Sequence, residues 1–204
     1  MPTGSGKSVC YQIPAIMLEG ITLVIFPFIS LMRDQVTALI QTGIPAAYLN
    51  SSLTPGQFSK ALSRAAAGAY KIIYVAPERL ESFEFLRFAL STDISMVTVD
   101  EAHCVSQWGQ DFRPSYLKIV NFVNKLPKRP VVAAFTATAT RTVKNDIITH
   151  LNLDKPLKVS TGYNRENLYF GVRKPENKLS ELLNIINIHN GQNGIVYCLT
   201  KKGS

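Results

Sequence analysis

Two short motifs hold residues whose types and spacing could do chemistry: PTGSGKS at residues 2–8 and VDEAH at residues 99–103. In the first motif, closely spaced glycines allow backbone N–H groups to surround phosphate oxygens, and the positive end of a following helix adds to the attraction. Lys7 would reach the β and γ phosphates of a nucleotide, and Ser8 would bind Mg²⁺. We therefore expect a nucleotide site formed by Thr3, Gly4, Ser5, Gly6, Lys7 and Ser8.

The first motif departs from the full phosphate-loop pattern at one position, because Met1 stands where that pattern has a glycine. A glycine-rich segment before a helix is often only a turn. The motif alone leaves both interpretations open, and the second motif favours phosphate binding.

The motif VDEAH places two carboxylates directly after a run of apolar, β-branched residues. In a parallel sheet, this end of a strand is where ligands bind. Asp100 would hold Mg²⁺, usually through water, and Glu101 would orient and deprotonate an attacking water. An Asp-Glu pair at this position could instead cap the next helix, but its occurrence together with a phosphate loop favours the chemical role. We expect ATP and Mg²⁺ as cofactors, with Lys7, Asp100 and Glu101 as the catalytic residues.

Two further groups of residues could lie beside the carboxylates. Thr136 and Thr138, in the run TATAT after an apolar segment, could bring hydroxyls to the same sheet edge, whereas Thr140 is better explained as a helix cap. His103 precedes Cys104, but two adjacent residues without a second pair make a poor zinc site. We expect His103 to form hydrogen bonds across the nucleotide edge as a coupling residue.

The segment SQWGQDFRP, residues 106–114, follows VDEAH almost at once and has a different chemistry. Trp108 and Phe112 could stack on unpaired bases, at about 1–3 kcal/mol per base, and Arg113 could hold a phosphate or stack on a base. Aromatic side chains more often fill a core. Here polar or flexible neighbours favour a surface-borne, mobile loop: Ser106, Gln107, Gly109, Gln110 and Asp111.

Strands and helices alternate along the chain, and this arrangement would position these motifs. Apolar, β-branched runs predict strands at residues 21–26, 71–75, 95–100, 131–135 and 194–198. Helical patterns cover residues 29–41, 55–68, 115–126, 140–151 and 181–190. Thr54 would cap the second of these helices with Pro55 at its first position, and Gly68 fits its end. The chain should therefore adopt an α/β fold, a parallel sheet with helices on both faces.

Composition narrows the class of protein. The 204 residues carry a net charge of +8 and a calculated pI of about 9.5, which favours a polyanionic partner. No apolar run reaches the roughly 18 residues of a membrane span, and no secretory signal is recognisable, so we expect a cytoplasmic protein without membrane contact. The three cysteines, Cys10, Cys104 and Cys198, lack the spacing of a zinc site or disulfide framework.

The motifs PTGSGKSVCYQIPA, FPFISLMRDQV, YVAPERL, VDEAHCVSQWGQDFRP, FTATAT and NRENLYF occur in this order, and together they resemble the RecQ family of superfamily 2 DNA helicases. The resemblance implies a RecA-like P-loop NTPase fold. It implies ATP and Mg²⁺ roles for Lys7, Ser8, Asp100 and Glu101. It implies coupling and DNA-binding roles for Gln107, Trp108, Phe112 and Arg113, and places Ser30, Arg33 and Gln35 near the DNA track.

By the same resemblance, the chain would belong to an ATP-dependent helicase that translocates on single-stranded DNA in the 3′-to-5′ direction and unwinds duplex DNA during repair and recombination. Gln110 stands where the family has histidine, and FPF replaces smaller residues before ISLM. We therefore expect the tuning of the loop after VDEAH to differ from that in the family, and the FPF change to concern packing.

The resemblance also suggests a domain organisation. Residues 1–160 would form the first RecA-like domain without its upstream strand and adenine-reading segment, residues 161–177 a linker, and residues 178–204 the start of a second RecA-like domain. We expect such a chain to be nearly inactive by itself, and to have a gap or rearranged sheet edge beside the phosphate loop.

Three alternatives remain. An RNA helicase of the DEAH or DEAD groups gives no reason for SQWGQDFRP to follow DEAH. A non-catalytic fragment that binds ATP and nucleic acid would share every motif. A small-molecule kinase would share the phosphate loop, but it leaves the DEAH strand and the TATAT turn unexplained.

Overall fold

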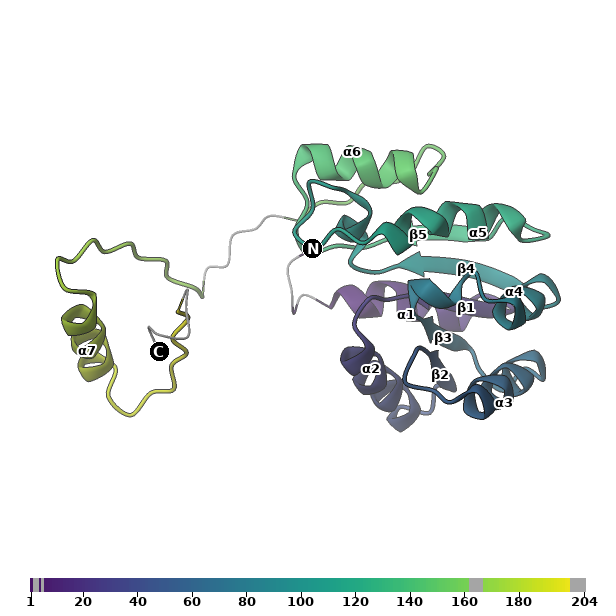
Figure 1. Ribbon diagram of the computed structural model, residues 1–204, viewed down its shortest axis with the longest axis horizontal. Coiled ribbons are helices and arrows are strands. Elements are labelled where there is room, and N and C mark those ends of the chain that lie inside the picture. The colour runs from purple at the N-terminus through teal and green to yellow at the C-terminus, as the bar shows by residue number, and fades with distance from the viewer. Residues whose placement is uncertain (2–3, 5, 162–166, 199–204) are drawn as a thin grey trace. The chain divides into compact units, whose positions relative to one another are not determined.

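The computed structural model describes residues 1, 4, 6–161 and 167–198. The chain divides into two compact units, unit 1 at Met1–Tyr163 and unit 2 at Asn164–Ser204 (Figure 1). All five strands that the structure describes belong to unit 1, and they form one sheet. The functional motifs named above, apart from NRENLYF, also fall in unit 1.

The sheet is parallel throughout, with the strand order β2-β3-β1-β4-β5. The strands are β1 (Ile21–Ile25), β2 (Ala46–Leu49), β3 (Ile72–Val75), β4 (Ile94–Val99) and β5 (Val131–Ala134). Four of them were predicted from apolar runs. β2 was not, because its four residues AAYL contain two alanines and give little β-branched signal.

Helices connect consecutive strands, as a parallel sheet requires. The helices of unit 1 are α1 (Lys7–Met17), α2 (Ile29–Gln41), α3 (Pro55–Ala66), α4 (Phe83–Leu90), α5 (Ile119–Lys125) and α6 (Arg141–His150). Short 3₁₀ helices are η1 (Pro77–Arg79), η2 (Ala102–Val105) and η3 (Pro114–Lys118). The predicted cap at Thr54 is confirmed as a capping box with Gln57, and Thr140 caps α6 through Val143 N–H.

Side chains that alternate along the strands enter two separate cores, one on each face of the sheet. One core joins α1 and α2 to strand residues such as Val24 and Tyr74. The other joins α3, α4, α5 and α6 to strand residues such as Leu23 and Val97. The predicted α/β fold with helices on both faces is confirmed.

β5 is an edge strand, because among the described residues it pairs only with β4. Its first residue, Val131, is 58% exposed, and the other three are half-buried, whereas every residue of β1 is buried. An apolar strand at an open edge leaves ladder groups available for pairing.

Unit 2 contains one described helix, α7 (Lys178–Ile188), which Asn177 caps by accepting hydrogen bonds from Leu179 N–H and Ser180 N–H. The predicted strand at residues 194–198 is wrong: this segment is neither strand nor helix, and Tyr197 is 90% exposed. A strand needs a hydrogen-bonded neighbour, and the described residues of unit 2 provide none.

Candidate active site

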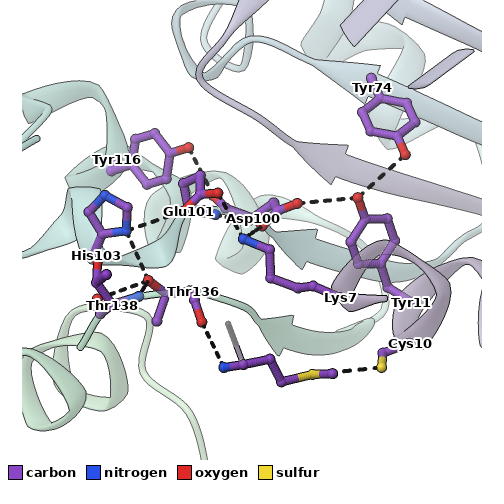
Figure 2. A network of polar contacts seen from close by, with 11 residues as sticks. Lys7, Cys10, Tyr11, Tyr74, Asp100, Glu101, His103, Tyr116, Thr136 and Thr138 are labelled. Atoms are coloured by element: carbon purple, nitrogen blue, oxygen red, sulfur yellow. Dashed lines mark hydrogen bonds and ion pairs between the residues drawn. The ribbon is translucent and has the colours of Figure 1, made fainter. Parts of the chain in front are cut away.

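Three segments meet at the carboxyl edge of the sheet. Lys7 and Ser8 begin α1, Asp100 and Glu101 follow β4, and Thr136 follows β5. Because β4 and β5 are parallel neighbours, their following residues lie side by side, and Ala102 N–H donates to Phe135 O at 2.8 Å. The edge where the sequence predicted chemistry is therefore the edge where Lys7, Asp100, Glu101 and the Thr136 turn lie together (Figure 2).

Lys7 contacts both predicted catalytic carboxylates. Its Nζ lies 2.7 Å from Glu101 Oε1 and 3.1 Å from Asp100 Oδ1. Burial alone would lower the pKa of Lys7, but the two carboxylates outweigh it, and the pKa lies above its ordinary value. Lys7 is therefore a fixed cation beside two carboxylates.

Asp100 is 2% exposed, and each part of it has a partner. Its Oδ1 accepts from Glu101 N–H at 2.8 Å, its Oδ2 accepts from the Tyr11 hydroxyl at 3.2 Å, and its backbone oxygen accepts from the Tyr116 hydroxyl at 3.0 Å. Burial raises the pKa of Asp100, and Lys7 only partly reverses this rise. The carboxylate is thus held in a fixed orientation, but its negative charge is only partly balanced by Lys7. A divalent cation bound beside it would balance this charge.

A histidine contacts the second carboxylate oxygen of Glu101 and orients the side chain. His103 Nδ1 lies 3.3 Å from Glu101 Oε2 and 2.9 Å from Thr136 Oγ1. Thr136 Oγ1 also donates to Thr138 O at 3.1 Å, which holds the turn after β5. His103 therefore joins the predicted general base to the Thr136–Thr138 turn, and its role in coupling stays a prediction.

The phosphate loop is described only in part, because Thr3 and Ser5 lie outside the described residues. Gly4 and Gly6 have φ of +80° and +79°, a left-handed conformation that non-glycine residues rarely adopt. Among the described residues, no atom would lie within 4 Å of a Cβ at either position, so backbone conformation accounts for both glycines.

The donor set fits a magnesium nucleotide. Mg²⁺ is usually held by one or two carboxylates together with substrate phosphates, and Asp100 and Ser8 are hard oxygen donors beside the amine of Lys7. Among the described residues, no group of three or more His, Cys, Asp or Glu side chains could hold a metal by protein ligands alone. Such a site would need phosphate oxygens to complete it.

The loop after η2 carries the predicted DNA-binding residues. Trp108 is 78% exposed, so its predicted surface position is confirmed; Gln107 is exposed and Phe112 is half-buried. The loop is closed at its base, where Arg113 N–H donates to Cys104 O at 2.9 Å. The buried Cys104 thiol, whose pKa burial raises to about 12, is unreactive.

Arg113 already has protein partners. Its guanidinium donates to Asp111 Oδ2 at 2.9 and 3.0 Å and to Pro27 O at 3.0 Å, and it lies over the Phe28 ring. Arg113 therefore connects the loop to the segment before α2.

The three residues predicted along the DNA track all belong to α2 but have different surroundings. Ser30 and Arg33 are exposed. Gln35 is half-buried, and its Oε1 accepts from Gln12 Nε2 of α1 at 3.5 Å. The structure brings Gln35 to α1 and leaves Ser30 and Arg33 at the surface.

Four residues at the site were not predicted: Tyr11, Tyr116, Ser106 and Asp146. Tyr11 follows Lys7 by four positions on α1, a spacing that puts both side chains on one helix face and could have indicated it. Tyr116 and Asp146 reach the site from η3 and α6 through the tertiary fold. No local pattern in the sequence indicates those two.

Comparison with known proteins agrees with this geometry. The profile of the DEAD/DEAH box helicase family matches residues 1–146, which include the phosphate loop, the carboxylates and the turn after β5. The chain belongs to the DEAD/DEAH box helicase family.

Within this family the chain is similar to RecQ proteins. It is 50% identical over 99% of its length to the ATP-dependent DNA helicase RecQ of Bacillus subtilis, and 41% identical over 97% to that of Pasteurella multocida. It covers 34% and 31% of those two proteins, about a third of their length. The resemblance that the motifs indicate is confirmed.

Solved helicase structures share the fold at low identity. The Hef helicase domain of Pyrococcus furiosus aligns with 74% of this chain, over 32% of the Hef chain, at a TM-score of 0.57 and 23% identity. A hypothetical ATP-dependent RNA helicase of Sulfolobus tokodaii aligns with 76% of the chain and 44% of its own, at a TM-score of 0.57 and 21% identity. No helix in the described part of the chain is long and apolar enough to cross a membrane.

Proposed function

We propose that unit 1 is the ATP-binding unit of a RecQ-type DNA helicase, in which Mg²⁺-ATP binding and hydrolysis drive 3′-to-5′ movement along single-stranded DNA and unwinding of duplex DNA. One observation carries the proposal: the contacts Lys7–Glu101–His103 lead directly into the loop that exposes Trp108. Residues 1–160, which hold these contacts, are proposed as the first RecA-like domain.

In the proposed reaction, Lys7 moves from the carboxylates to the β and γ phosphates. Mg²⁺, held by Ser8, Asp100 and the phosphates, would neutralise charge that develops on them. Glu101, released from Lys7, orients and deprotonates the attacking water, a contribution of about 10²–10⁴-fold for general-base catalysis. His103 keeps Glu101 Oε2 in place while this happens.

His103 and Thr136 would then report the state of the nucleotide to the DNA-binding residues. Gln107 follows η2 closely, and Trp108 and Phe112 would stack on unpaired bases. Arg113 and the exposed Ser30 and Arg33 would contact the phosphate backbone of the bound DNA strand. Gln35 would lie behind them on α2. This arrangement supports a single-stranded nucleic acid as the partner.

Trp108 is the only tryptophan of the chain, so its fluorescence tests the proposal without a label. After circular dichroism has verified that the chain is folded, single-stranded DNA is titrated at low salt, with and without Mg²⁺ and ATP. We expect a saturable change that weakens with salt and shifts when nucleotide is added. A folded chain whose Trp108 responds to neither ligand would contradict the proposal.

Two further titrations separate the alternatives. Labelled DNA and RNA of the same sequence, followed by anisotropy, distinguish a DNA-dependent from an RNA-dependent protein.

Trp108→Ala should weaken binding to labelled DNA about tenfold, because one stacked base contributes about 1–3 kcal/mol, whereas Trp108→Phe should retain most of the affinity. Equal affinity of both variants would exclude stacking by Trp108.

A further inference from the structure

Ser106 begins the loop that carries Trp108, and its side chain is completely buried. Its hydroxyl donates to Asp146 Oδ2 at 2.5 Å and accepts from Trp108 N–H at 3.2 Å. A short bond to a carboxylate is stronger than a hydrogen bond between neutral groups. The backbone of the exposed Trp108 is therefore fixed, through one hydroxyl, to a carboxylate outside its own loop.

Asp146 belongs to α6, the helix that follows the Thr136–Thr138 turn. Thr140 caps α6. Val143 and Ile147, on the inner face of α6, are buried in the core of unit 1 and anchor the helix to it. His103 bonds Thr136 at the beginning of the same segment. The segment from β5 to α6 thus bonds to His103 of η2, beside Glu101, and to Ser106, at the beginning of the loop that carries Trp108.

The loop has little room to adjust between these points. Gly109 N–H donates to Ser106 O at 2.9 Å, and a Cβ at Gly109 would lie 2.2 Å from His103 O. A displacement of Ser106 would therefore shift Trp108 as well. The exposed indole is carried on a backbone whose position Ser106 and His103 determine.

We propose that Asp146 is a positioning residue for DNA binding: through Ser106 it places Trp108 for stacking on an unpaired base, and it relays movement of the Thr136–Thr140 turn to the loop. This inference rests on the proposed function, since it assigns Trp108 to DNA. It adds the Ser106–Asp146 bond to the contact of His103 with Thr136, so that the segment after β5 can act on the position of Trp108 as well as on His103.

The test uses the whole chain with Asp146→Ala, Asp146→Asn, Ser106→Ala and the double variant Ser106→Ala/Asp146→Ala. Asp154→Ala and Asp154→Asn are matched controls, because Asp154 is exposed and its loss changes the net charge equally. This match matters because removing any negative charge strengthens nonspecific attraction to DNA. Circular dichroism and thermal melting identify any variant that does not fold.

Three quantities are measured for each folded variant: affinity for labelled single-stranded DNA, affinity for a fluorescent ATP analogue, and quenching of Trp108 by acrylamide without ligand. We expect Asp146→Ala to weaken DNA binding about threefold to tenfold relative to Asp154→Ala, with altered Trp108 quenching and unchanged nucleotide affinity. Asp146→Asn keeps an oxygen acceptor and should recover part of the DNA affinity. A general structural role would lower nucleotide affinity equally.

The double variant decides whether Asp146 acts through Ser106. If it does, the double variant binds DNA no more weakly than Ser106→Ala alone, whereas additive losses would overturn the inference. The inference is also overturned if Asp146→Ala and Asp154→Ala have the same DNA affinity and the same quenching of Trp108. A wild-type chain that does not bind DNA would instead contradict the proposed function, so the two failures are distinguishable.

Discussion

Lys7 Nζ lies 2.7 Å from Glu101 Oε1, which joins the amine predicted to bind phosphate directly to the carboxylate predicted to activate water. Neither group can serve its proposed role while this ion pair is intact. Nucleotide binding would have to break it, and the free energy of the pair opposes binding. Glu101, the proposed general base, therefore stays bonded to Lys7 until a phosphate competes for Lys7.

Glu101→Gln should bind nucleotide about threefold to tenfold more tightly than the wild type, because the neutral amide holds Lys7 less strongly. Any ATP hydrolysis should fall at the same time, since the amide cannot accept a proton. Titration of a fluorescent ATP analogue measures the first effect. Glu81→Gln, which removes one charge from the exposed pair with Lys118, should change neither quantity. Weaker nucleotide binding by Glu101→Gln would show that the pair does not compete.

Asp100→Asn should stabilise the fold at neutral pH. Burial raises the pKa of Asp100 above its ordinary value of 3.8, so the folded chain binds this proton more tightly than the unfolded chain. The free energy of unfolding therefore falls as the pH rises through the folded pKa, and the ionised carboxylate remains unfavourable above it. The advantage of Asp100→Asn should be small near about pH 4 and should increase towards pH 7.

Thermal melts of both proteins at several pH values measure this difference. Mg²⁺ with nucleotide should stabilise the wild type more than Asp100→Asn, because the amide is a poorer ligand for a hard cation. A stability difference that stays constant across the pH range would refute the assignment to Asp100.

Much of the fold follows from local patterns, whereas the details of the site do not. β1, β3, β4 and β5 are apolar runs, and α2 has the bounds that its periodicity predicts. β2 has too few branched residues to be recognised, and residues 194–198 have the composition of a strand without a neighbour to pair with. Composition indicates a tendency to form a strand, but pairing depends on the rest of the sheet.

The site shows the same division. Motif spacing indicated Lys7, Asp100 and Glu101, which do meet in the structure. Their surroundings come from distant segments: Tyr116 of η3 donates to Asp100 O, and Asp146 of α6 accepts from Ser106 at the beginning of the neighbouring loop. Such contacts depend on tertiary packing, and a single sequence does not reveal them.

Tyr11→Phe should weaken Mg²⁺-ATP binding several-fold and lower the free energy of unfolding by about 1–2 kcal/mol, because it removes a buried donor to Asp100 Oδ2. Burial raises the pKa of Tyr11, so its hydroxyl stays protonated and donates at every pH at which the chain is studied. Tyr48→Phe is the control, a half-buried tyrosine of β2. Equal effects of the two substitutions on nucleotide affinity would show that Tyr11 does not position Asp100.

Gly109→Ala should displace the loop, because the new Cβ would lie 2.2 Å from His103 O, a backbone atom that cannot turn aside. We expect a changed Trp108 emission, DNA binding reduced about tenfold or more, and nearly normal nucleotide affinity. Gly56→Ala is a matched control, since no atom in the described part of the chain lies within 4 Å of its Cβ position. If Gly109→Ala retains wild-type DNA affinity, the exact position of the loop is unimportant for binding.

The hydrogen bonds of Asp100 reach both cores of unit 1. Tyr11, which donates to its carboxylate, belongs to the core under α1 and α2, while Tyr116, which donates to its backbone, belongs to the core on the opposite face. The side chains of β4 divide between the same two layers, with Val97 and Val99 in one and Met96 in the other. A cation that pulls on Asp100 would therefore tighten both layers at once, and amide hydrogen exchange should slow together in α1 and η3, although the sheet lies between them.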